Sequence, residues 1–184
     1  MPQAKVQTGE GLTHDDFIAQ AQSLVPLLRE KVREAEVARR PLDEVIDAVR
    51  ATDIFSLMVP KRYGGHEADI DTFFEVSLTL SRADASMGWL IGFYIEHAFW
   101  FCHFPQNVQD EIFGDANHIL APAALNLAGG FAKKVEGGYQ LSGQWAWGTG
   151  IIHSTWVMAG SLMTNEDGSI SPMFFILPRE DVEA

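Results

Sequence analysis

Residues 131–150 read FAKKVEGGYQLSGQWAWGTG, and this stretch decides the fold. Apolar and polar residues alternate through 139–142, which is the period of a β-strand, and residues 131–136 predict the strand before it. The pair Gly137-Gly138 separates the two runs, and paired turn residues between two such runs indicate a hairpin. We therefore predict a β-hairpin closed by a two-residue turn of a primed type.

The strands predicted beyond this hairpin extend it into one sheet. Residues 144–149 predict a third strand, whose alternation would put Trp145 and Trp147 on one face. Residues 156–163 and 170–177 predict a second hairpin. Hairpins in succession predict an antiparallel sheet, and nothing after it in the sequence would cover its open edge. We therefore expect a chain that is incomplete or that relies on a partner.

Before residue 117 the apolar residues recur with the period of α-helices. Thr13 suits the N-cap of a first helix, and Pro26 should kink or split that helix. Pro41 suits the first position of a second helix. The most apolar stretch is 86–104, which predicts a helix that is apolar all round and therefore buried.

The change of period near residue 117 predicts the fold class and the domains. We expect an α+β fold, with an N-terminal α-helical domain over residues 1–116. A partial β domain, built as an antiparallel sheet, is expected over residues 117–184.

Composition excludes several classes of protein. A chain with 47% hydrophobic residues and a net charge of -12 is neither a disordered tail nor a binder of phosphate backbones, so we expect no nucleic-acid partner. No apolar run is long enough to cross a membrane, so we expect no membrane-spanning helix and no membrane partner. Cys102 is the only cysteine, and the six histidines lack metal-ligand spacing. We therefore predict no metal site and a reducing, cytoplasmic setting.

Two clusters could carry chemistry. Gly148 and Gly150 flank Thr149, so a planar aromatic cofactor could approach the backbone and place its polar edge at the Thr149 hydroxyl. Composition alone favours the alternative, in which these residues only pack a sheet on helices. Trp89 and His97 are two helical turns apart and share a face, so His97 is a candidate acid, base or hydrogen-bond donor. The alternative is a histidine that only fills the core.

Four motifs follow one another along the chain. They are Val59-Pro60-x-x-Tyr63-Gly64-Gly65, Ala83-x-Ala85-Ser86-x-Gly88-Trp89, Gly137-Gly138-Tyr139-x-Leu141-Ser142-Gly143-x-Trp145, and Thr149-Gly150. In this order the chain resembles the acyl-CoA dehydrogenase fold superfamily. Within it, the chain looks most like the reduced-flavin-dependent two-component monooxygenases.

The resemblance implies a larger architecture than this sequence contains. Such proteins have a helical N-terminal domain, a central β domain and a C-terminal four-helix bundle, and they usually form tetramers. The C-terminal bundle is absent from this chain, which stops partway through the β domain. A homo-oligomer is therefore implied as well.

The resemblance also implies roles for individual residues. His97 and Thr149 are the implied catalytic residues, the Thr149 hydroxyl lying near the flavin N5. Trp89 lines the substrate side together with His97. Trp147, Thr149 and Gly150 contact the cofactor.

The implied reaction oxygenates a small aromatic organic substrate with O₂ and a reduced flavin, FMN or FAD, supplied by a separate flavin reductase. Two other interpretations stay open. The first is a flavoenzyme of the acyl-CoA dehydrogenase type, in which a carboxylate removes the α-proton of the substrate. The second is a truncated, non-catalytic module for flavin binding or assembly.

Overall fold

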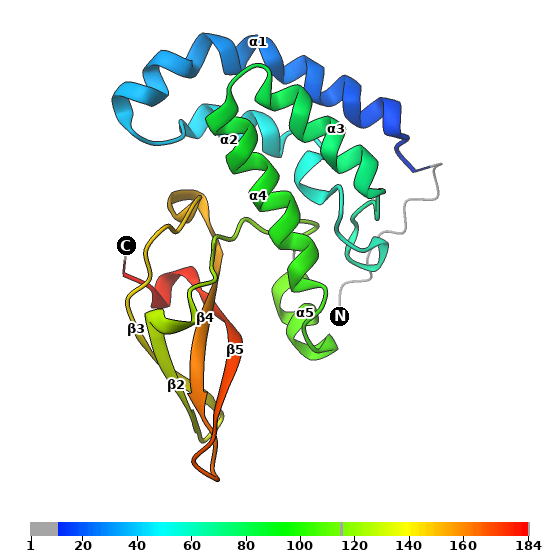
Figure 1. The fold of residues 1–184 in the computed structure, drawn as a ribbon. Helices are drawn as coiled ribbons and strands as arrows, with labels where there is room; N and C mark the ends of the chain where they lie inside the picture. The colour runs from blue at the N-terminus through cyan, green and yellow to red at the C-terminus, as the bar shows by residue number, and fades with distance from the viewer. Residues whose placement is uncertain (1–10, 115, 184) are drawn as a thin grey trace. The chain divides into compact units, whose positions relative to one another are not determined.

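The computed structural model describes residues 11–114 and 116–183. Within these residues five α-helices come first and five strands follow, the helices ending at Phe113 and the strands beginning at Ala123 (Figure 1). The chain divides into two compact units, of which the first ends at Ile119 and the second begins at Leu120. The fold is thus a mixed one of helices and a sheet.

The first unit holds the helices. Their bounds are α1 His14–Ala38, α2 Asp43–Arg50, α3 Ile70–Ser81, α4 Ala85–Phe101 and α5 Gln106–Phe113. The capping box at Thr13 is confirmed, because its side chain and that of Asp16 each accept from the other's backbone N–H. The expected start of the second helix at Pro41 is wrong, since α2 begins at Asp43.

Of the two effects expected of Pro26, a kink or a split of the first helix, the split is wrong. α1 runs for 25 residues with Pro26 inside it. Pro26 has no N–H to donate to the carbonyl of Gln22, four residues earlier. Both residues are exposed, so water can bind that carbonyl in place of the missing donor.

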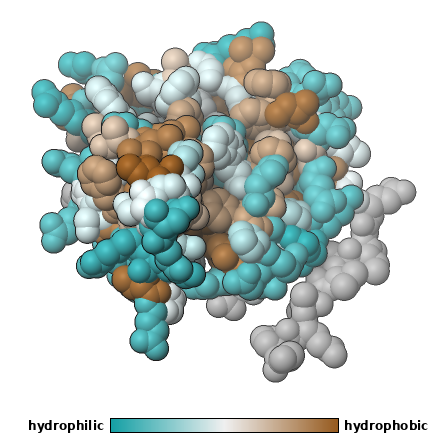
Figure 2. Space-filling view, turned by 60° about the horizontal axis from the view of Figure 1, so that its bottom comes forward, coloured by the Kyte–Doolittle hydropathy of each residue, from teal (hydrophilic) through white to brown (hydrophobic). Residues whose placement is uncertain are grey.

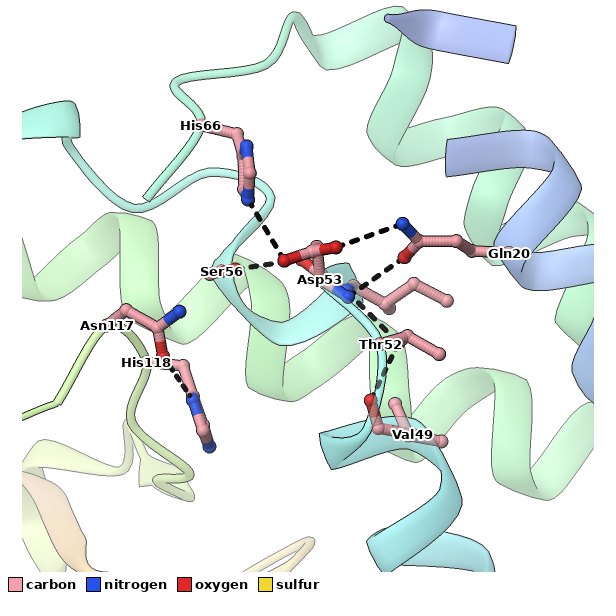
Figure 3. A network of polar contacts seen from close by, with 9 residues as sticks. Gln20, Val49, Thr52, Asp53, Ser56, His66, Asn117 and His118 are labelled. Carbon is pink, nitrogen blue, oxygen red and sulfur yellow. Dashed lines mark hydrogen bonds and ion pairs between the residues drawn. The ribbon is translucent and has the colours of Figure 1, made fainter. Parts of the chain in front are cut away.

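A polar network fastens α1 to the loop that follows α2 (Figure 3). The side chain of Gln20 accepts from the backbone N–H of Asp53 at 2.9 Å and donates to its carboxylate at 3.0 Å. Nε2 of His66 lies 3.5 Å from the same carboxylate. The ring of His66 also meets Phe17 edge-on, with centroids 5.2 Å apart. The network therefore joins three segments that are distant in sequence.

Small residues let α3 and α4 approach closely. A Cβ atom added to Gly88 would lie 2.2 Å from Oγ of Ser81, so no larger residue fits there without a shift. The sequence predicted that α4 is buried all round. This prediction is wrong, because the side chains of Trp89 and Phe99 are 61% and 41% exposed. Figure 2 likewise shows apolar residues on the surface among hydrophilic ones. Across the ranges described, no helix combines the length and apolarity that crossing a lipid bilayer requires.

The second unit holds a mixed sheet, so the expectation of an antiparallel one is wrong. Its strands are β1 Ala123–Ala124, β2 Gly130–Val135, β3 Gly138–Gly143, β4 Trp156–Thr164 and β5 Ile170–Pro178. β2 pairs with β3, and β4 with β5, in antiparallel fashion. However, β1 and β2 both lie parallel to β4. The reason is the segment 144–155, which carries the chain from the end of β3 across to the other side of β2.

The hairpin of β2 and β3 is confirmed, but its turn differs from the prediction. Val135 pairs with Gly138, which puts Glu136 and Gly137 in the turn. Among the described residues of the turn, only Gly137 has a positive φ, of 84°. Primed turns need a positive φ at their first central residue, which here is Glu136. The turn is therefore not of a primed type.

Candidate functional site

The segment after β3 is not a strand, contrary to the prediction for residues 144–149. Its first anchor is Trp145, whose Nε1 donates to the carbonyl of Gly160 at 2.7 Å. The indole fills a slot that exists because three neighbours lack side chains. Added Cβ atoms would lie 2.4 to 2.9 Å from indole atoms at Gly129, Gly130 and Gly143. Trp145 is therefore a packing residue of the second unit.

Trp147 lies in a different environment, so the prediction that it shares a face with Trp145 is wrong. Its side chain is 91% exposed and its φ is 68°. The alternation of a strand does not apply, because the chain turns between the two residues. A left-handed conformation costs a non-glycine residue about 1–2 kcal/mol. Because the indole is exposed, its burial does not offset this cost. Residues held in strained backbone conformations cluster at functional sites.

The turn after Trp147 brings the other predicted cofactor residues together. The backbone N–H of Thr149 donates to the carbonyl of Trp147 at 3.0 Å, and that of Ile151 donates to Gly148 at 3.1 Å. Gly150 has a φ of 87° and is the N-cap of the short 3-10 helix η4 (Ile151–His153). Within the described residues the Thr149 hydroxyl makes no hydrogen bond.

This turn, residues 147–151, presents one apolar plane and one hydroxyl without a partner in the described chain. A Cβ atom added at Gly148 would lie 3.6 Å from Cβ of Ile151, which is an ordinary van der Waals contact, so the turn is not crowded at this position. An exposed indole next to a free hydroxyl suits a planar heteroaromatic ligand with a polar edge.

The predicted pair on α4 is linked by a third aromatic ring. The rings of Trp89 and Phe93 have centroids 4.7 Å apart, and Phe93 meets His97 edge-on at 4.9 Å. The prediction that Trp89 and His97 share a face is therefore confirmed. Sequence reasoning missed Phe93, although its position midway between them, four residues from each, was the signal.

The three rings lead from the surface to the core of the first unit. Trp89 is exposed, whereas His97 is only 3% exposed. Nε2 of His97 lies 3.9 Å from a carboxylate oxygen of Glu96, which is partly exposed. Asp84 fixes the start of α4 by accepting from the N–H of Ser86 at 2.8 Å. A buried imidazole at the end of an aromatic row can exchange a proton with a ligand that reaches it.

The predicted site residues thus form two groups. Trp89 and His97 lie in the first unit, and Trp147, Thr149 and Gly150 lie in the second. Neither group contains a cysteine. Burial raises the pKa of the Cys102 thiol to about 11, so it is protonated at neutral pH and is no nucleophile.

The chain matches no protein-family model. It is 34% identical over 173 residues to a pigment production hydroxylase from a Rhodococcus species, covering 94% of this chain and 44% of that protein. It is 29% identical over 178 residues to the oxygenase component of an FADH₂-dependent resorcinol hydroxylase from a Rhizobium species, covering 94% and 42%.

The fold has solved counterparts. The structure of XiaF from a Streptomyces species, in complex with FADH₂ and glycerol, matches with a TM-score of 0.85 at 29% identity. The match covers 91% of this chain and 42% of XiaF. The chain spans less than half the length of the curated relatives it matches. Sequence and fold together relate the chain to the oxygenase components of flavin-dependent hydroxylases.

Proposed function

We propose that this chain forms part of the oxygenase component of a two-component monooxygenase, which uses reduced flavin and O₂ to hydroxylate a small aromatic substrate. The observation that carries the proposal is the likeness, over almost the whole chain, to the resorcinol hydroxylase and to XiaF with its FADH₂. A separate reductase would supply the reduced FMN or FAD, and the assembled enzyme would be a homo-oligomer.

The turn at 147–151 has the chemistry to hold part of a flavin. The exposed indole of Trp147 offers a plane against which the ring system can pack. The hydroxyl of Thr149, which has no partner in the described chain, can hydrogen-bond the polar edge near N5. Gly150, which has no side chain, would contact the ring through its backbone. When bound, reduced flavin would supply the two electrons that activate O₂, and O₂ would supply the oxygen atom.

The residues of α4 would act on the substrate side. Trp89 is exposed and can stack on an aromatic ring, and His97 lies buried two turns further along the helix. His97 would hold or accept the proton of a substrate hydroxyl, which makes the ring more electron-rich at the moment of oxygen transfer. The aromatic row would at the same time keep water away from that proton.

Flavin binding to the full chain tests the proposal. We expect FMN or FAD, each reduced under anaerobic conditions, to quench tryptophan fluorescence on titration. Thr149→Ala should weaken binding by about 2- to 13-fold, the equivalent of one hydrogen bond of about 0.5–1.5 kcal/mol. Thr149→Ser should bind as the parent chain does. Thr155→Ala makes the same chemical change at an exposed site in the same unit and should have no effect.

The alternatives give other results. A module that serves assembly alone binds neither flavin. An acyl-CoA dehydrogenase is reduced by its own acyl-CoA without a reductase, so bleaching of bound oxidised flavin by an acyl-CoA would overturn the monooxygenase.

A further inference from the structure

The carbonyl of Ile151, at the end of the 147–151 turn, is the meeting point of several hydrogen bonds. Nε of Arg179 donates to it at 3.1 Å, and the hydroxyl of Ser154 donates to it at 2.8 Å. The backbone N–H of Ser154 reaches the same oxygen at 3.5 Å. A carbonyl with this many donors is held in one orientation, and so is the peptide unit to which it belongs.

Arg179 is itself fixed at both its backbone and its side chain. It follows β5 directly and opens the short 3-10 helix η5 (Arg179–Asp181). Its backbone N–H donates to the carbonyl of Thr155 at 3.0 Å, and its guanidinium also donates to the carbonyl of Val182. The guanidinium is therefore pre-organised to hold Ile151, rather than a flexible side chain that happens to be near it.

We propose that Arg179 is a positioning residue for the 147–151 turn. Trp145 anchors the chain where it enters the turn, and Arg179 anchors it where it leaves. Between these anchors Trp147 keeps an unfavourable left-handed conformation, which persists only where the surroundings enforce it. The proposal has two parts. The first, that Arg179 orders the turn, is independent of the proposed function, and the second, that this order prepares the turn for flavin, rests on it.

Arg179→Met is the test variant, because it keeps an unbranched apolar stem and removes every donor. Arg179→Lys keeps the charge but has a single donor group, which cannot bond the carbonyls of both Ile151 and Val182 with the same geometry. Lys133→Met is the matched control. It removes one positive charge from an exposed position in the same unit, where the side chain contacts no described residue through a hydrogen bond or ion pair.

Hydrogen–deuterium exchange of the full 184-residue chain reads out the turn without any flavin. The reporters are the amides of Thr149, Ile151 and Ser154, each of which donates to a carbonyl of the turn. In Arg179→Met we expect them to exchange about ten-fold faster, which corresponds to about 1.4 kcal/mol. The amides of β2 and β3 should keep their rates, and Arg179→Lys should be intermediate. Unchanged exchange at these reporters, or an equal rise throughout β2 and β3, overturns the proposal.

Titration with reduced FMN and FAD is the second arm. If the parent chain binds flavin, Arg179→Met should weaken binding about ten-fold, while Lys133→Met leaves it unchanged. Equal affinity of Arg179→Met and the parent chain refutes the role of Arg179 towards flavin. A parent chain that binds neither flavin overturns the proposed function and that role together. In that case faster exchange in Arg179→Met still establishes that Arg179 orders the turn.

Discussion

The slot for Trp145 makes Gly130 a position in the second unit where one added methyl group should matter. A Cβ atom at Gly130 would lie 2.4 Å from Cζ2 and 2.6 Å from Cη2 of the indole, and 2.8 Å from the carbonyl oxygen of Ser142. Ordinary van der Waals contact begins near 3.4 Å, so the Gly130→Ala methyl group needs a shift of about 1 Å in the indole or in β3.

The size of the effect follows from two opposed terms. Alanine at an unstrained position stabilises a fold by about 0.4–1 kcal/mol, because it restricts the unfolded chain. Overpacking a tight site costs about 1–3 kcal/mol. The hydrogen bond from Trp145 to Gly160, at 2.7 Å, resists movement of the indole and adds about 1 kcal/mol if it breaks. We therefore expect Gly130→Ala to lower the free energy of unfolding by about 1–3 kcal/mol.

Urea denaturation followed by far-ultraviolet circular dichroism measures this difference. The control is Gly138→Ala in the same hairpin, where an added Cβ atom meets nothing within 4 Å, and it should be neutral or stabilising. The double variant Gly130→Ala, Trp145→Phe should cost less than the sum of its two single variants, since the smaller ring leaves room for the methyl group. If Gly130→Ala proves no more destabilising than Gly138→Ala, the slot does not constrain the indole and the anchoring of the turn fails with it.

Three further predictions concern the exposed turn and two histidines. Trp147→Asn should raise the free energy of unfolding by up to about 1 kcal/mol in urea titration, because asparagine tolerates a positive φ, yet it should weaken flavin binding. In the active holoenzyme, His97→Ala should lower the fraction of reduced flavin oxidation that is coupled to product by about ten-fold to 10⁴-fold. His103→Ala, at an exposed histidine, should leave this fraction unchanged, and hydroxylated product and H₂O₂ measured together will show the difference. Burial, and then the nearby Arg50 charge, lower the pKa of His118. The unfolded chain therefore binds this proton more tightly, so the contribution of His118 to stability is complete above about pH 6.5 and is lost as the pH falls through the folded pKa. Urea titrations from pH 5 to 8 should show a flatter acid limb for His118→Gln, and an unchanged slope would contradict the assignment.

Local chemistry predicted the elements whose cause is local. The capping box at Thr13 depends on residues three positions apart, and the hairpin of β2 and β3 depends on a pair of glycines between two short runs. The parallel pairing of β2 with β4 joins Phe131 to Leu162, and no periodicity within either strand records it. A hairpin predicts its own two strands but not which strand lies on its far side.

The two tryptophans at 145 and 147 show why the candidate site was only partly predictable. The alternation that would put both on one face assumes a strand, but the chain leaves β3 at Gly143. Gly143 of the motif Gly143-x-Trp145 acts together with Gly129 and Gly130. The three glycines make room for the indole of Trp145. Their openness is therefore already used, and it does not serve a ligand. In this segment the exposed indole of Trp147 and the hydroxyl of Thr149 remain available to a ligand. The residues that could bind a ligand are therefore the few between Trp145 and the carbonyl of Ile151, to which Arg179 donates.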